Sequence, residues 1–146
     1  MNILKLEDLI TAWEKDSTIN DTEPATELLR VPNLHAKYSQ QLVLHNLALK
    51  AKTAKYYQLK KLKVDYYAGR LTSEELQKRG WEQFQFVLKE DRQVYIDADE
   101  DLLKIKSQMA IHEEASKLAE MIVRELNSRT YQLRSYIDWQ KFIQGQ

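Results

Sequence analysis

The residues whose types could do chemistry gather in one stretch of the chain, residues 50–70. It contains seven basic residues and four tyrosines around a single acid, Asp65: Lys50, Lys52, Lys55, Lys60, Lys61, Lys63 and Arg70, with Tyr56, Tyr57, Tyr66 and Tyr67. Ammonium groups bind phosphates regardless of base sequence, and aromatic rings stack on unpaired bases. The stretch therefore favours binding of single-stranded nucleic acid. A solvated helix face with packed tyrosines is the alternative for the same composition.

Charge is unevenly distributed along a chain whose formal net charge is zero. Residues 28–70 hold nine basic side chains and one acid, a net charge of +8. Residues 1–27 have a net charge of −5, and residues 71–146 have a net charge of −3. Such segregation produces a local field that attracts polyanions even when the whole chain is neutral.

The sequence offers little support for catalysis. It has no cysteine and only three glycines, too few for a nucleotide-binding loop, and it lacks the common hydrolase and phosphate-binding motifs. Its three histidines, His35, His45 and His112, share no ligand-like spacing. We therefore expect a binding protein with no catalytic residue, metal or cofactor.

One acidic cluster raises a metal hypothesis. Asp97, Asp99, Glu100 and Asp101 lie within five residues, and carboxylates are ligands for Mg²⁺ and Ca²⁺. No glycine-centred calcium loop accompanies them, and acidic residues are also what the start of a helix favours. We expect Asp99 to cap the final helix, and a Mg²⁺-dependent nuclease using Asp97, Asp99 and Asp101 ranks far behind a binding function.

The scarcity of glycine and proline predicts an all-α fold with two long helices, in one elongated domain. We expect N-terminal docking helices in residues 1–31, with an apolar stripe led by Trp13 and a break at Pro32. A long basic helix should fill 32–70, ended by Gly69. A short helix opened by a Thr72–Glu75 capping box and closed by Gly80 should precede an irregular connector, within 71–98. A long C-terminal helix should fill 99–146.

Helical spacing assigns faces to the two long helices. On the first, the predicted apolar seam consists of Val43, Leu44, Leu47, Ala51, Ala54 and Leu62. The cationic, aromatic face roughly opposite consists of Lys52, Lys55, Tyr56, Lys60, Lys63, Tyr66, Tyr67 and Arg70. On the second, a continuous apolar seam is expected to pack and oligomerise the chain, and its residues are Ile111, Leu118, Ile122, Leu126, Leu133 and Ile137. No stretch approaches the ~20 apolar residues of a membrane span, so we expect a soluble, intracellular protein.

Four segments of the sequence carry a resemblance to a known family. They are LEDL at 6–9, PNLHAKY at 32–38, KLKVDYYAGR at 61–70, and an ending that runs from SRTY at 128–131 to IDWQKF at 137–142. The most specific is KLKVDYYAGR, because neither charge nor amphipathicity requires that string. The chain resembles the UvsY family, the recombination mediators of large myoviruses. Residues 81–96 and the acidic cluster after them resemble the family only loosely.

The resemblance implies a fold, a function and partners. Family members are helical subunits that form hexameric or heptameric rings and bind single-stranded DNA. They contact the phage RecA-like recombinase and single-strand-binding protein, help displace the latter and load the former for strand exchange, replication and repair. The expected location is the host cytoplasm.

By position, Lys61 and Lys63 would be the leading DNA contacts, and the helical wheel places Lys63 on the cationic face but Lys61 near the apolar seam. The complete expected set is Lys52, Lys55, Lys60, Lys61, Lys63, Tyr66, Tyr67 and Arg70. The main alternative is a coiled-coil scaffold whose basic face binds an acidic protein.

Overall fold

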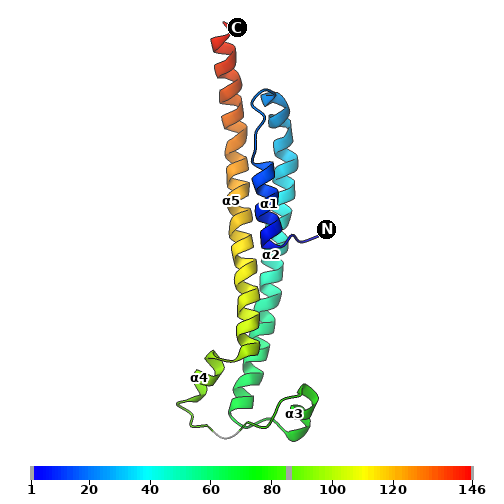
Figure 1. Cartoon of the computed structure of the whole chain (residues 1–146), viewed down its shortest axis with the longest axis vertical. Helices are drawn as coiled ribbons and strands as arrows, with labels where there is room; N and C mark the ends of the chain where they lie inside the picture. The colour runs from blue at the N-terminus through cyan, green and yellow to red at the C-terminus, as the bar shows by residue number, and fades with distance from the viewer. Residues whose placement is uncertain (1, 85–86, 146) are drawn as a thin grey trace. The chain divides into compact units, whose positions relative to one another are not determined.

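The computed structural model of the protein describes residues 2–84 and 87–145, in which the regular secondary structure is helical and no β-strand is present. The helices are α1 (Leu6–Asp16), α2 (Pro24–Tyr67), α3 (Ser73–Arg79), α4 (Arg92–Asp97) and α5 (Glu100–Ile143) (Figure 1). The predicted all-α class with two long helices is confirmed. Gln85 and Phe86, inside the expected irregular connector, lie outside the described residues.

The chain forms two compact units. The first comprises Met1–Ala48 and Ile111–Gln146, and the second comprises Leu49–Ala110. Each unit therefore contains one half of α2 and one half of α5, while α1 belongs to the first unit and α3 and α4 belong to the second. The single domain expected from the sequence stays a prediction.

The first unit packs α1 against α2 and α5 (Figure 1). Leu9 of α1, Tyr38 of α2 and Ile122 of α5 are fully buried in one apolar cluster. Trp13 meets the Tyr38 ring edge-on at 5.4 Å between centroids. The docking role predicted for the Trp13 helix is confirmed, since so short a helix needs tertiary contacts for its stability.

Pro32 does not end a helix, contrary to the sequence prediction. The helix α2 begins at Pro24 and continues through Pro32 to Tyr67. A proline inside a helix removes one backbone hydrogen bond and crowds the preceding turn. Val31 and Leu34 on either side are both buried in the first unit, and this packing offsets the local cost.

The predicted apolar seam of α2 is wrong. Val43 and Leu47 are 55% and 58% exposed, and Ala51 and Ala54 are also exposed. The buried line follows a different face, which carries Val31, Leu34, Tyr38, Gln41, His45, Tyr56 and Lys63. Three of these residues are polar, so a search for apolar residues at helical spacing selected the wrong side of the helix.

Half of the predicted seam of α5 is buried within the chain, and its role in oligomerisation stays a prediction. The buried residues of this face are Ala115, Ile122, Leu126 and Leu133, and the side chain of Arg129 is buried among them. Arg129 donates to the carbonyl oxygens of Asp16 and Ser17 at 3.3 and 3.0 Å. This face is covered by the chain itself, whereas Ile111 is 51% exposed and Leu118 and Ile137 are half-buried.

The helix caps that the sequence predicted are present in the second unit. The Thr72–Glu75 capping box is present at the start of α3, and Gly80 ends α3 in the left-handed conformation. Gly69 ends α2 at φ +72°, where its N–H donates to Tyr66 O and the Arg70 N–H donates to Asp65 O. Asp99 caps α5, its Oδ1 accepting from Leu102 N at 3.0 Å.

Part of the segment from Trp81 to Ile96, which was predicted irregular, is helical. The short helix α4 occupies Arg92–Asp97, and its Ile96 joins Tyr56 and Leu102 in the core of the second unit. In the described residues, no helix is both long enough and apolar enough to cross a lipid bilayer.

Candidate nucleic-acid interface

Lys63 lies in a buried ionic cluster within the second unit. Lys63 is 5% exposed, and its Nζ is 3.1 Å from Asp99 Oδ2 and 2.8 Å from Asp101 Oδ2. The same ammonium lies 4.2 Å from the centre of the Trp81 ring, a cation–π distance. The wheel assignment of Lys63 to an open cationic face is therefore wrong, and Asp99 and Asp101 already neutralise its charge.

Asp99 connects several elements of this cluster. Its Oδ2 also accepts a 2.6 Å hydrogen bond from the Tyr67 hydroxyl, while its Oδ1 caps α5. Burial acts to raise the pKa of Asp99, but hydrogen bonds from Tyr67, Leu102 and Lys63 hold it below its usual 3.8. Burial acts to lower the pKa of Lys63, yet the two carboxylates keep it above 10.5. Both groups are therefore charged at neutral pH.

Tyr66 and Tyr67 belong to an aromatic cluster instead of an open stacking surface. Tyr66 lies 5.1 Å from Trp81, and Tyr67 lies 4.8 Å from Phe84, between ring centroids. The Tyr66 hydroxyl donates to the Glu82 carbonyl oxygen at 2.6 Å. Both tyrosines are half-buried, so packing of the connector occupies much of their ring surface.

The other predicted cations lie at the surface of the second unit. Lys55 and Lys61 are exposed, and Lys52 and Lys60 are half-buried. Within residues 2–84 and 87–145, none of these four lysines forms an ion pair, while Arg70 pairs with Asp65 at 3.4 Å. Lys61 therefore has the open position that the wheel had given to Lys63.

Two residues outside the predicted set share this surface. Tyr57 is 62% exposed, and its ring lies 5.4 Å from that of Tyr56. Lys106 of α5 is exposed and holds its Nζ 5.7 Å from the centre of the Tyr56 ring. Helical spacing could have identified Tyr57, but Lys106 meets α2 through tertiary contact, which left no local signal in the sequence.

The acidic cluster is occupied by protein contacts. Asp99 and Asp101 bind Lys63, and Asp97 Oδ1 accepts from Gln93 Nε2 at 2.7 Å. Among the described residues, no group of three or more histidine or carboxylate side chains is placed to hold a metal ion. The geometry thus gives no support to the metal-dependent nuclease alternative.

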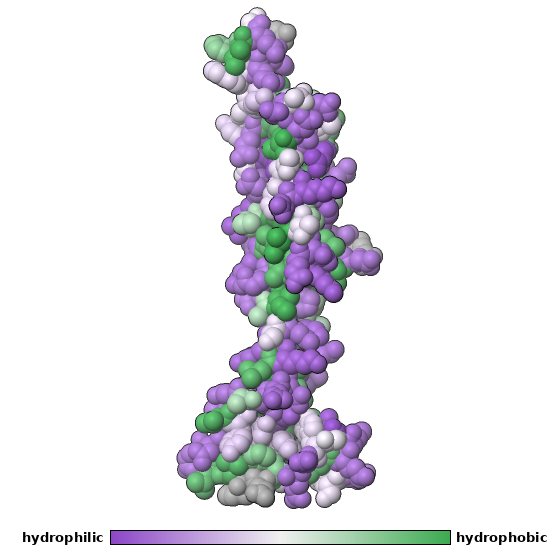
Figure 2. All heavy atoms as spheres, viewed as in Figure 1, coloured by the Kyte–Doolittle hydropathy of each residue, from purple (hydrophilic) through white to green (hydrophobic). Residues whose placement is uncertain are grey.

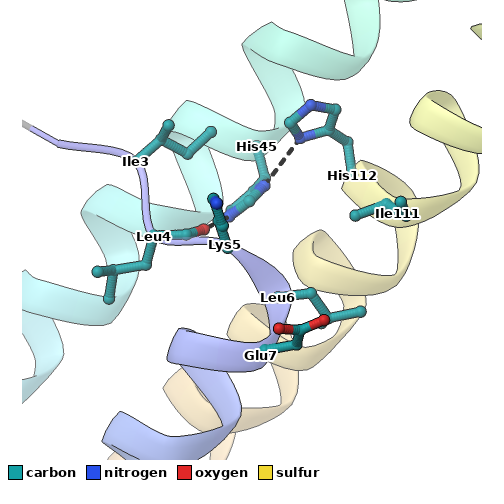
Figure 3. Close-up of a pocket in the computed structure, with 8 residues that line it drawn as sticks. All are labelled: Ile3, Leu4, Lys5, Leu6, Glu7, His45, Ile111 and His112. Atoms are coloured by element: carbon teal, nitrogen blue, oxygen red, sulfur yellow. Dashed lines mark hydrogen bonds between the residues drawn. The ribbon is translucent and has the colours of Figure 1, made fainter.

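A pocket of about 360 Å³ lies in the first unit beside two histidines (Figure 3). His45 Nε2 contacts the Leu4 carbonyl oxygen at 2.9 Å, and His45 Nδ1 contacts His112 Nδ1 at 3.0 Å. Because a carbonyl oxygen only accepts, His45 Nε2 must carry the proton. In neutral His45 the Nδ1 then accepts, and His112 Nδ1 is the donor. This pair fastens the N-terminal segment to α2 and α5.

The C-terminal end of α5 exposes apolar side chains (Figure 2). Trp139 and Phe142 stack with centroids 5.8 Å apart, and both are exposed, as is Ile143. Large exposed apolar groups in one place are typical of a protein–protein contact.

Comparison with known proteins finds a matching protein family and similar solved structures. Residues 12–146 match the model of a family described as recombination, repair and ssDNA binding protein UvsY. The fold is similar to crystal structures of the bacteriophage T4 recombination mediator protein UvsY. For lattice type II the TM-score is 0.80 at 21% identity, covering 95% of this chain and 97% of that chain. For lattice type I it is 0.78 at 20% identity, covering 92% and 98%. No curated protein matches the sequence.

Proposed function

The chain belongs to the UvsY family of recombination, repair and single-stranded-DNA-binding proteins, and we propose that it works as a recombination mediator assembled from several copies. In this proposal a hexameric or heptameric ring binds single-stranded DNA, helps displace the phage single-strand-binding protein and loads the phage RecA-like recombinase. Strand exchange, recombination-dependent replication and repair would follow. The protein binds and hands over the strand without a chemical step of its own.

The observation that carries the proposal is the set of lysines without ion pairs on the second unit. Lys52, Lys55, Lys60 and Lys61 lie on α2, and no acid of the described residues pairs with them. Ammonium groups left without counter-charge attract phosphates and bind them in a salt-dependent way. Tyr57 adds an exposed ring on which a base can stack.

The burial of Lys63 divides the predicted DNA contacts into two groups. We propose that Lys52, Lys55, Lys60 and Lys61 contact phosphates, with Arg70 near the end of α2. Lys63, Tyr66 and Tyr67 instead hold the end of α2 against the connector and the start of α5. They act on DNA by positioning this end of the helix.

The subunit contacts of the ring require apolar surface that the chain does not cover itself. Ile122, Leu126 and Leu133 of the predicted set are buried within one chain. We therefore propose that Ile111, the half-buried Leu118 and Ile137, and the exposed pair Trp139 and Phe142 take part in assembly. A ring repeats each weak phosphate contact, so the copies together bind a strand more tightly than one copy does.

Titration of a fluorescent single-stranded oligonucleotide, at low and high salt and with Mg²⁺ or EDTA, tests DNA binding. We expect salt-sensitive binding without cleavage, and weaker binding with a smaller salt slope for the Lys60→Ala/Lys61→Ala variant. Lys117→Ala is the single-charge control, because Lys117 pairs with Glu113 and Glu114 in the first unit. Assembly without oligonucleotide binding would instead favour a scaffold protein, and metal-dependent cleavage would favour a nuclease.

Loading is tested separately from binding. Recombinase filaments are assembled on DNA already covered with single-strand-binding protein, with and without this protein. We expect the wild type to shorten the delay before assembly and Lys60→Ala/Lys61→Ala to do so less. An unchanged delay with the wild type would contradict the mediator role even if DNA binding were intact.

A further inference from the structure

We propose that Lys106 of α5 contacts phosphate, so that single-stranded DNA lies along a surface shared by α2 and α5 and not along α2 alone. This inference rests on the proposed function and adds a binding residue from the other long helix. Its basis is the contact of Lys106 with the Tyr56 ring in the second unit, on the face of α2 that also carries Lys52 and Lys60.

Tyr56 is the centre of this arrangement. Its side chain is buried against α5, and Lys106 Nζ lies 5.7 Å from its ring centre. Lys52 and Lys60 stand one helical turn before and after Tyr56, on the same face of α2, because residues four apart are neighbours on a helix surface. Lys106 of α5 therefore lies beside the face of α2 that carries Lys52 and Lys60.

Among residues 2–84 and 87–145, no acid pairs with these three lysines. The residues three and four positions from Lys106 are Leu102, Leu103, Met109 and Ala110, and those around Lys52 and Lys60 are likewise without Asp or Glu. In the described part of the chain, none of the three lysines forms an ion pair. Like charges held near one another repel, and a bound polyanion removes that repulsion. The surface thus complements a phosphate chain.

The exposed ring of Tyr57 beside these lysines favours single-stranded over double-stranded DNA as the ligand. Tyr57, edge-on to Tyr56, is 62% exposed, so a strand whose phosphates follow the lysines can place an unpaired base on its ring. Bases in a duplex are already stacked on one another and gain nothing from such a ring. We therefore expect single strands to be preferred at this surface.

A packing role for Lys106 is separable from phosphate binding. A lysine stem covers apolar surface while its ammonium stays in water, and Lys106→Met retains the stem but removes the charge. Lys104→Met is the matched control, since Lys104 is an exposed lysine of the same helix without an ion pair among the described residues. Lys106→Arg restores the charge.

The experiment titrates full-length protein into a fluorescent oligothymidylate at several salt concentrations. We expect Lys106→Met to bind about tenfold more weakly at low salt and to show a salt slope smaller by about 0.7 for each subunit that contacts the strand. Lys104→Met and Lys106→Arg should match the wild type. If Lys106→Met and Lys104→Met bound with equal affinity, the inference would be overturned. Binding by the wild type would still support the proposed function. A wild type that binds no oligonucleotide would overturn both.

A second measurement uses the unaltered protein and so does not depend on the folding of any variant. Lysines are acetylated with and without the oligonucleotide, and the modified positions are quantified by mass spectrometry. We expect bound DNA to protect Lys106 several-fold and to leave Lys104 reactive. Equal reactivity of Lys106 in both samples would contradict a phosphate contact at this residue.

Discussion

At the scale of residues, the contrast between Lys61 and Lys63 is the most instructive. The two lysines stand two positions apart on α2, so they point to different sides of the helix. Lys61 is exposed, whereas Lys63 is enclosed by Asp99, Asp101 and Trp81. The same residue type therefore serves the surface in one case and the packing of the second unit in the other.

Loss of the Lys63 charge should destabilise the protein. In Lys63→Met the buried Asp99 loses its ionic partner, and we expect the free energy of unfolding to fall by about 3 kcal/mol. Lys61→Met should change it by less than about 0.5 kcal/mol. Urea denaturation followed by circular dichroism measures both. Equal stabilities of the two variants would contradict the structural role of Lys63.

His45 should make stability depend on pH. Burial lowers its pKa below the usual 6.5, the charge of His112 lowers it further, and the hydrogen bond to Leu4 partly opposes both. A folded-state pKa below the unfolded one means that the unfolded chain binds the proton first. Stability is therefore lost as the pH falls below about 6.5. Lys5 and Glu7 are the charged side chains that line the pocket beside His45 and His112.

We expect the melting temperature to drop by about 2–4 °C between pH 7.5 and pH 5.5. His45→Gln should flatten this dependence, and His35→Gln should keep it. Asp16 and Asp99, whose pKa values are lowered from 3.8, lose their contributions only at lower pH. Differential scanning calorimetry at several pH values checks the result, and an unaltered pH profile in His45→Gln would reject it.

At the scale of elements, most helix ends were predictable, but the buried face of α2 was not. Gly69 ends α2 because its φ of +72° suits glycine, and Asp99 begins α5 because its carboxylate accepts a backbone N–H. Both signals involve residues a few positions apart. Pro32 is the exception, since its buried neighbours in the first unit keep α2 helical through it.

Gly69→Ala should lower the free energy of unfolding by about 1 kcal/mol, because a Cβ disfavours the left-handed conformation. No atom lies within 4 Å of the added Cβ, so the cost comes from the backbone alone. Gly145→Ala has the same φ but follows the last helix, and we expect almost no change there. Thermal denaturation compares the two, and equal losses would contradict this explanation.

At the scale of the whole molecule, α5 has two apolar surfaces that differ in exposure. Leu126 is fully buried in the first unit, whereas Trp139 and Phe142 are exposed at the end of the helix. The long helix α5 therefore packs its own chain along one face and leaves apolar side chains exposed at its C-terminal end.

Substitutions on these two surfaces should have separate effects. Leu126→Ala is expected to lower the free energy of unfolding by about 2–5 kcal/mol through the cavity it leaves. Trp139→Ser/Phe142→Ser should keep the melting temperature but reduce the molar mass measured by light scattering. A double variant that retains the mass of the wild type would remove this end of α5 from the proposed ring contacts.

The sequence by itself determined the all-α class, the two long helices, the caps at Gly69, Thr72, Gly80 and Asp99, the charge asymmetry and the family, because all of these depend on composition, on residues close together in the chain or on a specific string such as KLKVDYYAGR. Only the tertiary structure decided which face of α2 is buried. That face includes Gln41, which binds backbone atoms of Asn2 and Leu4, His45, which meets His112, and Lys63, which meets Asp99. Polar side chains can be buried only where partners complete their hydrogen bonds and charges, and those partners are far away in the sequence.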